Sequence, residues 1–154
     1  MIARLIGTMR RIRGDERGAS AIEFGLFAPI LAGALMGVTD VAMGYASKLA
    51  LEQAAYRSLE NVQVRPVQTS YSYLQAEAAT AAGVPTGQVT VANWLECNRV
   101  AQSNYLGTCP SGEETSRYVR VTITSSFRPR FSYGVLPTVN GVVPLTASAT
   151  VRVQ

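Results

Sequence analysis

Residues 17–39 of the chain read RGASAIEFGLFAPILAGALMGVT, and this segment organises the rest of the sequence around it. The 21 residues from Ala19 to Thr39 include one charged residue, Glu23. An α-helix needs about 20 apolar residues to cross the hydrocarbon core of a bilayer. The segment therefore predicts a transmembrane helix over residues 19–40.

Charge is spread unevenly along the chain, whose net charge is +4. Residues 1–18 hold five of the 14 basic residues and two acidic ones, so this end carries +3 and the remainder carries +1. The positive-inside rule then places the N-terminus in the cytoplasm and residues 41–154 outside it. A nearly neutral body offers no basic surface, so no nucleic-acid partner is expected.

The apolar segment begins with a pattern typical of proteolytic processing. A basic leader ends in Gly18, the small residue Ala19 follows, and Glu23 and Phe24 stand together inside the apolar run. This pattern resembles the processing site of type IV prepilins, and most closely that of the TadE-like proteins of the Tad (Flp) pilus system. The resemblance implies that a prepilin peptidase cuts after Gly18 and that residues 1–18 are a cytoplasmic leader.

Glu23 is the residue whose presence most needs explaining, because a carboxylate inside a membrane helix is costly unless it is paired. Cleavage after Gly18 would create a positive α-amine on Ala19, one helical turn before Glu23 and on the same face. We expect this amine to neutralise Glu23 on the same subunit or on a neighbour. The alternative is that Glu23 is simply an acid in a first helical turn, where the helix dipole favours it.

Small residues and a proline mark the middle of the segment. Pro29 has no N–H to donate to the carbonyl of Gly25, so a kink or a locally melted turn is expected there. Gly33 and Gly37 are four residues apart, a spacing that lets helices pack closely in a bilayer. Glycine is also simply common in membrane helices, which is the competing explanation.

The helical pattern continues beyond the predicted membrane segment. Tyr45, Leu49, Tyr56 and Leu59 recur at helical spacing, and charged residues take other positions. We therefore predict one helix over residues 19–63, whose second half lays this stripe on the soluble body.

A short second helix is predicted at residues 71–82. Ser72 and Gln75 have the spacing of a capping box. Gly83 and then Pro85 follow the alanine-rich run in the order expected at a helix end.

Three strands are predicted after this helix, at residues 88–92, 118–124 and 145–153. Apolar and polar residues alternate in the last two, as in a sheet with one face on a core and the other in solvent. The fold class is therefore α+β: a long membrane-spanning helix that continues into a small domain with a short helix and a three-stranded antiparallel sheet.

Cys97 and Cys109 lie in a polar stretch between two predicted strands. Outside the cytoplasm such a pair is expected to form a disulfide. The chain has no histidine, which removes triad catalysis and histidine-based metal sites, and two cysteines alone do not make a structural zinc site. We therefore expect no catalytic residue, no metal and no cofactor, and the protein is not expected to be an enzyme.

The C-terminal half also resembles the TadE-like pattern, with an alternating strand at 118–127, an aromatic and proline-rich connection at 128–144 and a final run at 145–152. The resemblance implies a minor pilin or pseudopilin in the bacterial inner membrane that serves Tad/Flp pilus assembly, adhesion and biofilm formation. It implies as partners the prepilin peptidase, the inner-membrane Tad platform proteins, the major Flp pilin and other TadE-, TadF- and TadG-like subunits.

There are two rival interpretations, and one of them, an extracytoplasmic enzyme, is disfavoured because the chain has so few acid-base residues. The other stays open. The chain could be a secreted or signal-anchored extracytoplasmic binding module unrelated to pili, with a signal-peptidase site at Ala42-Met43-Gly44. The N-terminus of the mature protein, Ala19, Tyr45 or Met1, separates processing by a prepilin peptidase from secretion and from a plain anchor.

Overall fold

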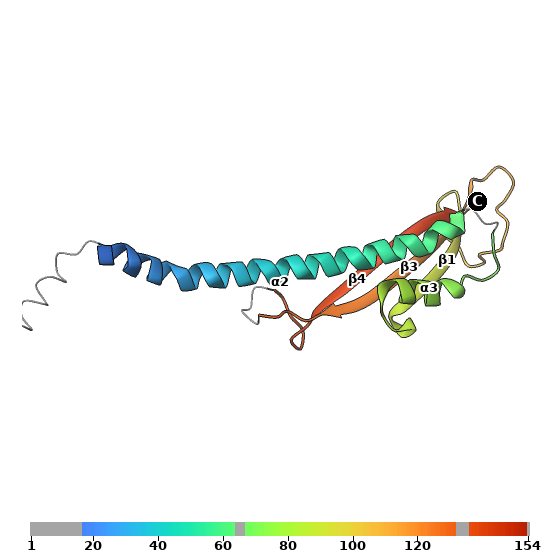
Figure 1. Cartoon of the computed structure of the whole chain (residues 1–154). Coiled ribbons are helices and arrows are strands. Elements are labelled where there is room, and N and C mark those ends of the chain that lie inside the picture. The colour runs from blue at the N-terminus through green and yellow to red at the C-terminus, as the bar shows by residue number, and fades with distance from the viewer. Residues whose placement is uncertain (1–16, 64–66, 132–135, 154) are drawn as a thin grey trace, which may run out of the picture. The chain divides into compact units, whose positions relative to one another are not determined.

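The computed structural model describes residues 17–63, 67–131 and 136–153 (Figure 1). Its elements, in chain order, are α2 (Arg17–Gln63), α3 (Tyr73–Ala82), the 3₁₀ turn η1 (Thr86–Gln88), β1 (Val89–Cys97), β2 (Val100–Gln102), β3 (Thr115–Phe127) and β4 (Val143–Val153). Nearly all of the expected leader lies outside the described residues. The chain divides into two compact units, residues 1–40 and 41–154, and α2 contributes to both.

In the first unit, residues 17–40 are helical throughout. The helix continues through Pro29, so the locally melted turn expected there is not present. Proline fixes φ near the helical value and removes one hydrogen bond, and the flanking turns keep the remaining ladder intact. The carbonyl of Gly25 is left without the N–H that another residue at position 29 would donate.

In the second unit, β1 to β4 form one antiparallel sheet in the order β2-β1-β3-β4. The prediction of three strands was therefore wrong by one. The additional strand, β2, pairs with β1 at Cys97↔Val100, Glu96↔Ala101 and Leu95↔Gln102. The two residues between β1 and β2, Asn98 and Arg99, have φ of 48° and 69°, as in a tight hairpin turn. A strand this short, exposed along its whole length, leaves no alternating pattern to detect.

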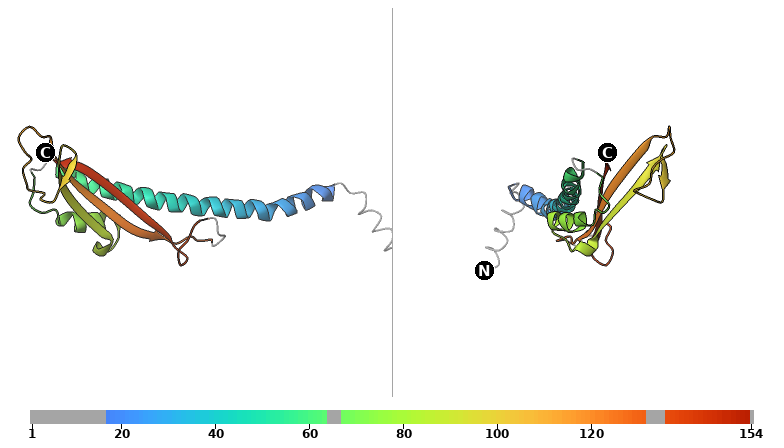
Figure 2. Two further views of the ribbon diagram at one scale, coloured as in Figure 1. Left: turned by 180° about the vertical axis from the view of Figure 1, so that it is seen from behind. Right: turned by 90° about the vertical axis from the view of Figure 1, so that its right-hand side faces the viewer.

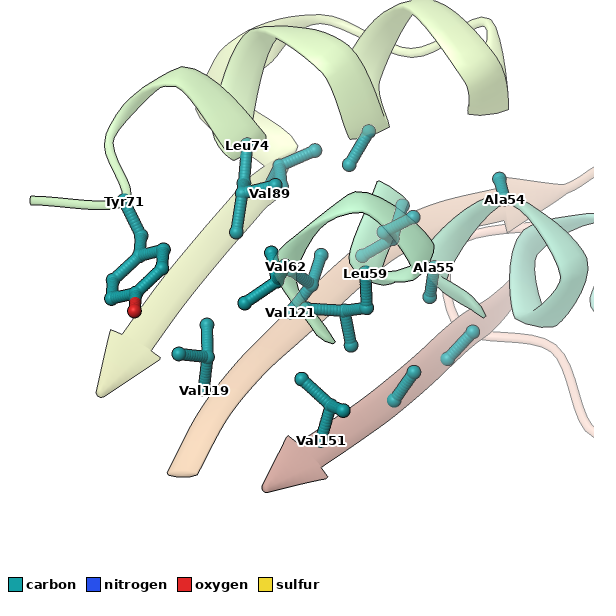
Figure 3. Packing of buried hydrophobic residues seen from close by; sticks show 14 of the residues in the cluster. Ala54, Ala55, Leu59, Val62, Tyr71, Leu74, Val89, Val119, Val121 and Val151 are labelled. Atoms are coloured by element: carbon teal, nitrogen blue, oxygen red, sulfur yellow. The ribbon is translucent and has the colours of Figure 1, made fainter. Parts of the chain in front are cut away.

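One face of the sheet carries the core, which α3 and residues 51–62 of α2 cover (Figures 2 and 3). Val119, Val121 and Ile123 of β3 are fully buried in it. Opposite them the helices contribute many small side chains, which let helix and sheet backbones approach closely. The buried alanines are Ala54 and Ala55 of α2, Ala78 and Ala79 of α3, and Ala147 and Ala149 of the sheet itself, in β4.

The helix face that packs on the sheet differs from the predicted stripe. Leu59 is buried as expected, but Tyr45, Leu49 and Tyr56 are 65%, 38% and 62% exposed. The packed face is instead made by residues at i, i+3, i+4, i+7, i+8 and i+11: Leu51, Ala54, Ala55, Ser58, Leu59 and Val62. Ser58 is accepted on this face because its hydroxyl donates to the carbonyl of Ala55 at 2.8 Å. The prediction followed the larger side chains, whereas close packing selects alanines.

The short helix ends as predicted but begins differently. Gly83 adopts φ 66° at its C-terminus, and the N–H groups of Gly83 and Val84 bond the carbonyls of Thr80 and Ala79. At the N-terminus Ser72 makes no side-chain capping bond, so the predicted capping box is absent. Gln75 instead donates to the carbonyls of Thr86 and Val89, tying α3 to the start of β1.

Candidate membrane and assembly site

The first unit presents apolar side chains on all sides of a single helix. Within the described chain, α2 is the one helix long and apolar enough to cross a membrane, by length and composition. Its large apolar residues before Asp40 are 60–70% exposed: Ile22, Phe24, Leu26, Phe27, Ile30, Leu31, Leu35 and Val38. A helix that is apolar all round is stable only inside a larger protein or a membrane. The chain itself therefore does not supply the surroundings that this part of α2 requires.

The residues of the expected processing site lie at the start of this helix. Arg17, Gly18 and Ala19 are already helical in the unprocessed chain, and Glu23 follows with an exposed side chain. The structure thus places Ala19 and Glu23 one turn apart in a continuous helix. The pairing of their amine and carboxylate stays a prediction, because the amine exists only after cleavage.

Small residues form a row along this helix. Gly25, Pro29, Gly33 and Gly37 are each four residues apart and so lie along one side of it. A β-carbon added at Gly25 or Gly33 would meet no atom of the chain within 4 Å. No packing within this chain therefore requires glycine at either position, and both leave space for the close approach of another helix.

In the second unit, a loop after β2 is fastened to the rest of the domain at several points. Cys97 and Cys109 are joined by a disulfide with a Cα–Cα distance of 5.5 Å. Arg117 donates to the carbonyls of Tyr105 and Gly107 at 3.2 and 2.7 Å. The hydroxyls of Tyr71 and Tyr105 lie 3.0 Å apart. The loop is thus held by one covalent bond and by polar contacts to β3 and to the segment before α3.

The environment of Tyr105 also affects its ionisation. Burial raises the pKa of the Tyr105 phenol above its ordinary value, and the hydrogen bond with Tyr71 raises the pKa further. The nearby guanidinium of Arg117 lowers this pKa, and its effect is the smaller one. The phenol is therefore neutral at physiological pH and remains available as a hydrogen-bond donor.

The outer face of the sheet carries a stacked cluster that the alternation of β3 did not by itself reveal. The rings of Trp94 and Tyr118, cross-strand partners on β1 and β3, are 5.3 Å apart and nearly parallel. The guanidinium of Arg120 lies 5.0 Å from the Trp94 ring, and Glu96 accepts a bond from the indole N–H at 2.7 Å. The indole N–H of Trp94 is bonded within the cluster, and Arg120 donates to the hydroxyl of Thr150 on β4 at 3.0 Å, so the cluster links three strands of the sheet.

Side chains that could bind a metal ion are not clustered in the described part of the chain. No three His, Cys, Asp or Glu side chains within residues 17–63, 67–131 and 136–153 are placed to hold a metal ion. Both cysteines are used in the disulfide. The most unusual feature is therefore the exposed apolar helix with its glutamate.

Comparison with known proteins identifies that same helix. Residues 18–59 match the family model described as TadE-like protein. No curated protein and no solved structure matches the chain. The family match starts at Gly18, the expected last residue of the leader, and ends before α3 and the sheet.

Proposed function

We propose that this chain, which carries a TadE-like family domain at residues 18–59, is a minor pilin or pseudopilin that takes part in the assembly of Tad/Flp adhesion pili. The observation that carries the proposal is that the matched segment is also the helix whose apolar side chains are left exposed. Members of this family are generally not enzymes.

In the proposed arrangement, residues 19–40 span the bacterial inner membrane once, with the N-terminus in the cytoplasm. Residues 41–154 lie outside the cytoplasm, where an oxidising compartment lets the Cys97–Cys109 disulfide persist. A prepilin peptidase removes residues 1–18. The membrane-embedded form then supplies the subunit to the inner-membrane Tad platform proteins.

Glu23 has an assembly role in this proposal. The new α-amine of Ala19 pairs with its carboxylate, within one subunit or between neighbours, so that the charge is tolerated among apolar helices. The open space at Gly25 and Gly33 allows a neighbouring helix to come close, whereas Gly37 is buried by the chain itself. The neighbours are the major Flp pilin and other TadE-, TadF- and TadG-like subunits.

The body also supports assignment to a minor rather than a bulk subunit. The sheet and α3 form a domain with its own core outside the membrane helix. In the pilus system that the family resemblance implies, the major Flp pilin is little more than a helix. A domain of this size fits a subunit present in few copies.

The decisive experiment is the N-terminal sequence and mass of the mature protein in cells with and without the peptidase. We expect the wild type to begin at Ala19, and Gly18→Arg to stay 18 residues heavier, because the peptidase pocket has no room for a side chain before the cut. Gly14→Arg, a glycine elsewhere in the leader, is the matched control and should be processed normally. Equal masses for wild type and Gly18→Arg would rule out this site.

The same experiment addresses the secreted alternative, for which the mature chain would begin at Tyr45. Gly44 stands inside α2, and a β-carbon there would come within 3.3 Å of the Phe127 ring. A cut after Gly44 would remove a helical turn that packs on β3. This packing favours processing at Gly18.

Glu23→Ala tests the assembly step separately. We expect normal insertion and cleavage, because removal of a membrane charge does not hinder either, and at least a tenfold loss of surface pili by electron microscopy. Glu52→Ala removes an exposed carboxylate from the body, 3.9 Å from Lys48, and should leave piliation unchanged. Normal piliation with Glu23→Ala would remove the pairing from the proposal.

A further inference from the structure

A groove of about 510 Å³ runs beside β1 in the second unit. None of the described residues that line it is charged, and several bear hydroxyl groups. They come from the segment before α3, from the first turn of α3, from η1 and from β1: Thr69, Ser70, Tyr71, Ser72, Gln75, Gly87, Val89, Thr90, Val91 and Asn93. The groove lies outside the TadE-like segment, so its role is separate from the membrane helix.

The wall formed by β1 is a strand edge that the sheet leaves uncovered. β3 pairs with β1 over its whole length, from Val89 to Cys97. β2 pairs only with residues 95–97. Residues 89–94, about 20 Å of strand, therefore have a partner on one side only within the described chain.

Backbone directions along β1 follow from the antiparallel ladder, in which alternate residues point their N–H and C=O to opposite sides. Gln75 of α3 donates to the carbonyl of Val89 at 2.9 Å, so Val89 points away from β3. Asn98 donates to the carbonyl of Glu114 at 3.0 Å, so even-numbered residues point toward β3. Val91 and Asn93 therefore direct their N–H and C=O groups into the groove. Among the described residues, nothing bonds the backbone of either.

The opposite edge of the sheet is protected where this edge is not. The same alternation, carried through the pair Val121↔Ala149, turns the even-numbered residues of β4 outward. Pro144 has no N–H to offer there, and Arg152 places an exposed charge on the edge. Proline and charge are the usual means by which sheet edges avoid pairing. Residues 89–94 contain neither.

We propose that the groove receives an extended, uncharged segment of another polypeptide, which pairs with Val91 and Asn93 as a fifth strand of the sheet. Donors and acceptors that repeat every second residue match an extended backbone. The described lining is neutral and disfavours a charged segment, and Thr69, Ser70 and Ser72 add hydroxyl-bearing side chains to the groove. A second copy of this chain is disfavoured as the occupant, because its β1 is already paired with its own β3. That β3 would have to lie on the far side of the incoming strand, where residues 69–72 line the groove.

The test uses the full-length chain in detergent micelles and a fluorescein-labelled heptapeptide of alternating threonine and valine. We expect saturable binding by fluorescence anisotropy. Val91→Pro removes one groove-facing N–H without touching the β1–β3 ladder and should weaken binding at least tenfold. Thr146→Pro removes an outward N–H from β4 in the same way and should change it less than twofold. Equal affinities for these two variants, or no binding to the wild type, would overturn the proposal.

Two further measurements keep the test independent of how well the variants fold. A peptide N-methylated at alternate residues on the edge that faces β1 should not bind, whereas methylation of the other edge should be tolerated. Amide exchange of Val91 and Asn93 should be fast in the free protein and at least tenfold slower with peptide. Slow exchange without peptide that depends on protein concentration would assign the edge to a second copy and overturn the peptide assignment. Failure of either arm leaves the Gly18 and Glu23 experiments unaffected.

Discussion

The two halves of helix α2 differ in where their apolar side chains lie. Residues 22–38 expose large apolar side chains, and Asp40 at the end of this stretch is buried, whereas residues 41–63 bury one narrow face and expose most of the rest. The first stretch depends on a surrounding phase outside the chain, and the second depends on the sheet of the same chain. One continuous helix thus joins a part stabilised by its environment to a part stabilised by its own core.

The difference between the two stretches is tested most strongly by truncating one leucine in each and comparing the effect on stability. Leu59 is 3% exposed, and Leu59→Ala should lower the free energy of unfolding of the second unit by about 2–5 kcal/mol, because a cavity is left in the core. Leu35 is 62% exposed, and Leu35→Ala should change it by less than about 0.5 kcal/mol. Urea unfolding in micelles, followed by the fluorescence of the single tryptophan, Trp94, measures both. Equal losses would mean that the two stretches are not distinct.

The disulfide should stabilise the second unit, residues 41–154, and should have no effect on residues 17–40. Cys97 and Cys109 are 12 residues apart in sequence, and the loop they close is worth roughly 3 kcal/mol in the chain-entropy model. Cys97→Ser and Cys109→Ser should each lower the stability of the body by about that amount, measured by the same urea transition. Cleavage after Gly18 should proceed normally, since it involves only the helix start. Free thiols at both positions in unreduced envelope protein would contradict the proposed location outside the cytoplasm.

Alkaline pH should also affect the body and leave the first stretch unchanged. The raised pKa of Tyr105 means that the folded state holds the phenol proton more tightly than the unfolded state does. This contribution is fully present below the ordinary tyrosine pKa of about 10 and is lost as the pH rises toward the folded value. Urea unfolding across this range should show falling stability, and Tyr105→Phe should show a smaller fall. An identical pH dependence in wild type and variant would exclude Tyr105 as its source.

The smallest effect is expected where the second stretch exposes an aromatic residue. Tyr56 is 62% exposed, so Tyr56→Ala should change the free energy of unfolding by no more than about 0.5 kcal/mol. It lies three residues from Leu59, which makes Leu59→Ala its matched comparison for the same urea transition. A loss as large as that of Leu59→Ala would show that the exposed side of the helix also carries the core.

The long apolar helix could be predicted from the sequence because its signal is local. Length, apolar composition and the position of Glu23 are all properties of consecutive residues, and residues 19–63 were predicted as the helix that α2 forms. The strands were predicted by alternation, although each is longer in the structure: β1 extends to Cys97 and β3 spans Thr115–Phe127. The Asn98-Arg99 turn was missed because neither residue is the glycine that usually marks positive φ.

The orientation of the second half of α2 could not be predicted in the same way. Tyr45, Leu49 and Tyr56 carry more apolar surface than Ala54 and Ala55, so the sequence pattern favoured them. The face on the sheet instead combines Leu51, Leu59 and Val62 with Ala54 and Ala55, whose small side chains let the helix backbone approach the sheet closely. A similar competition removed the capping box, since Gln75 is used to hold β1.

The sequence by itself determined the long apolar helix and the end of α3 at Gly83. It also placed Gly18 before Ala19 and Glu23 within the apolar run, and it excluded histidine-based chemistry. Only the tertiary structure decided which face of α2 is buried and which backbone groups of β1 remain unpaired. Helix length and charge depend on neighbours in sequence, so they are readable there. Packing faces and strand edges depend on residues far apart in the chain, such as Leu59 with Val121 or Gln75 with Val89, and exist only once those residues meet.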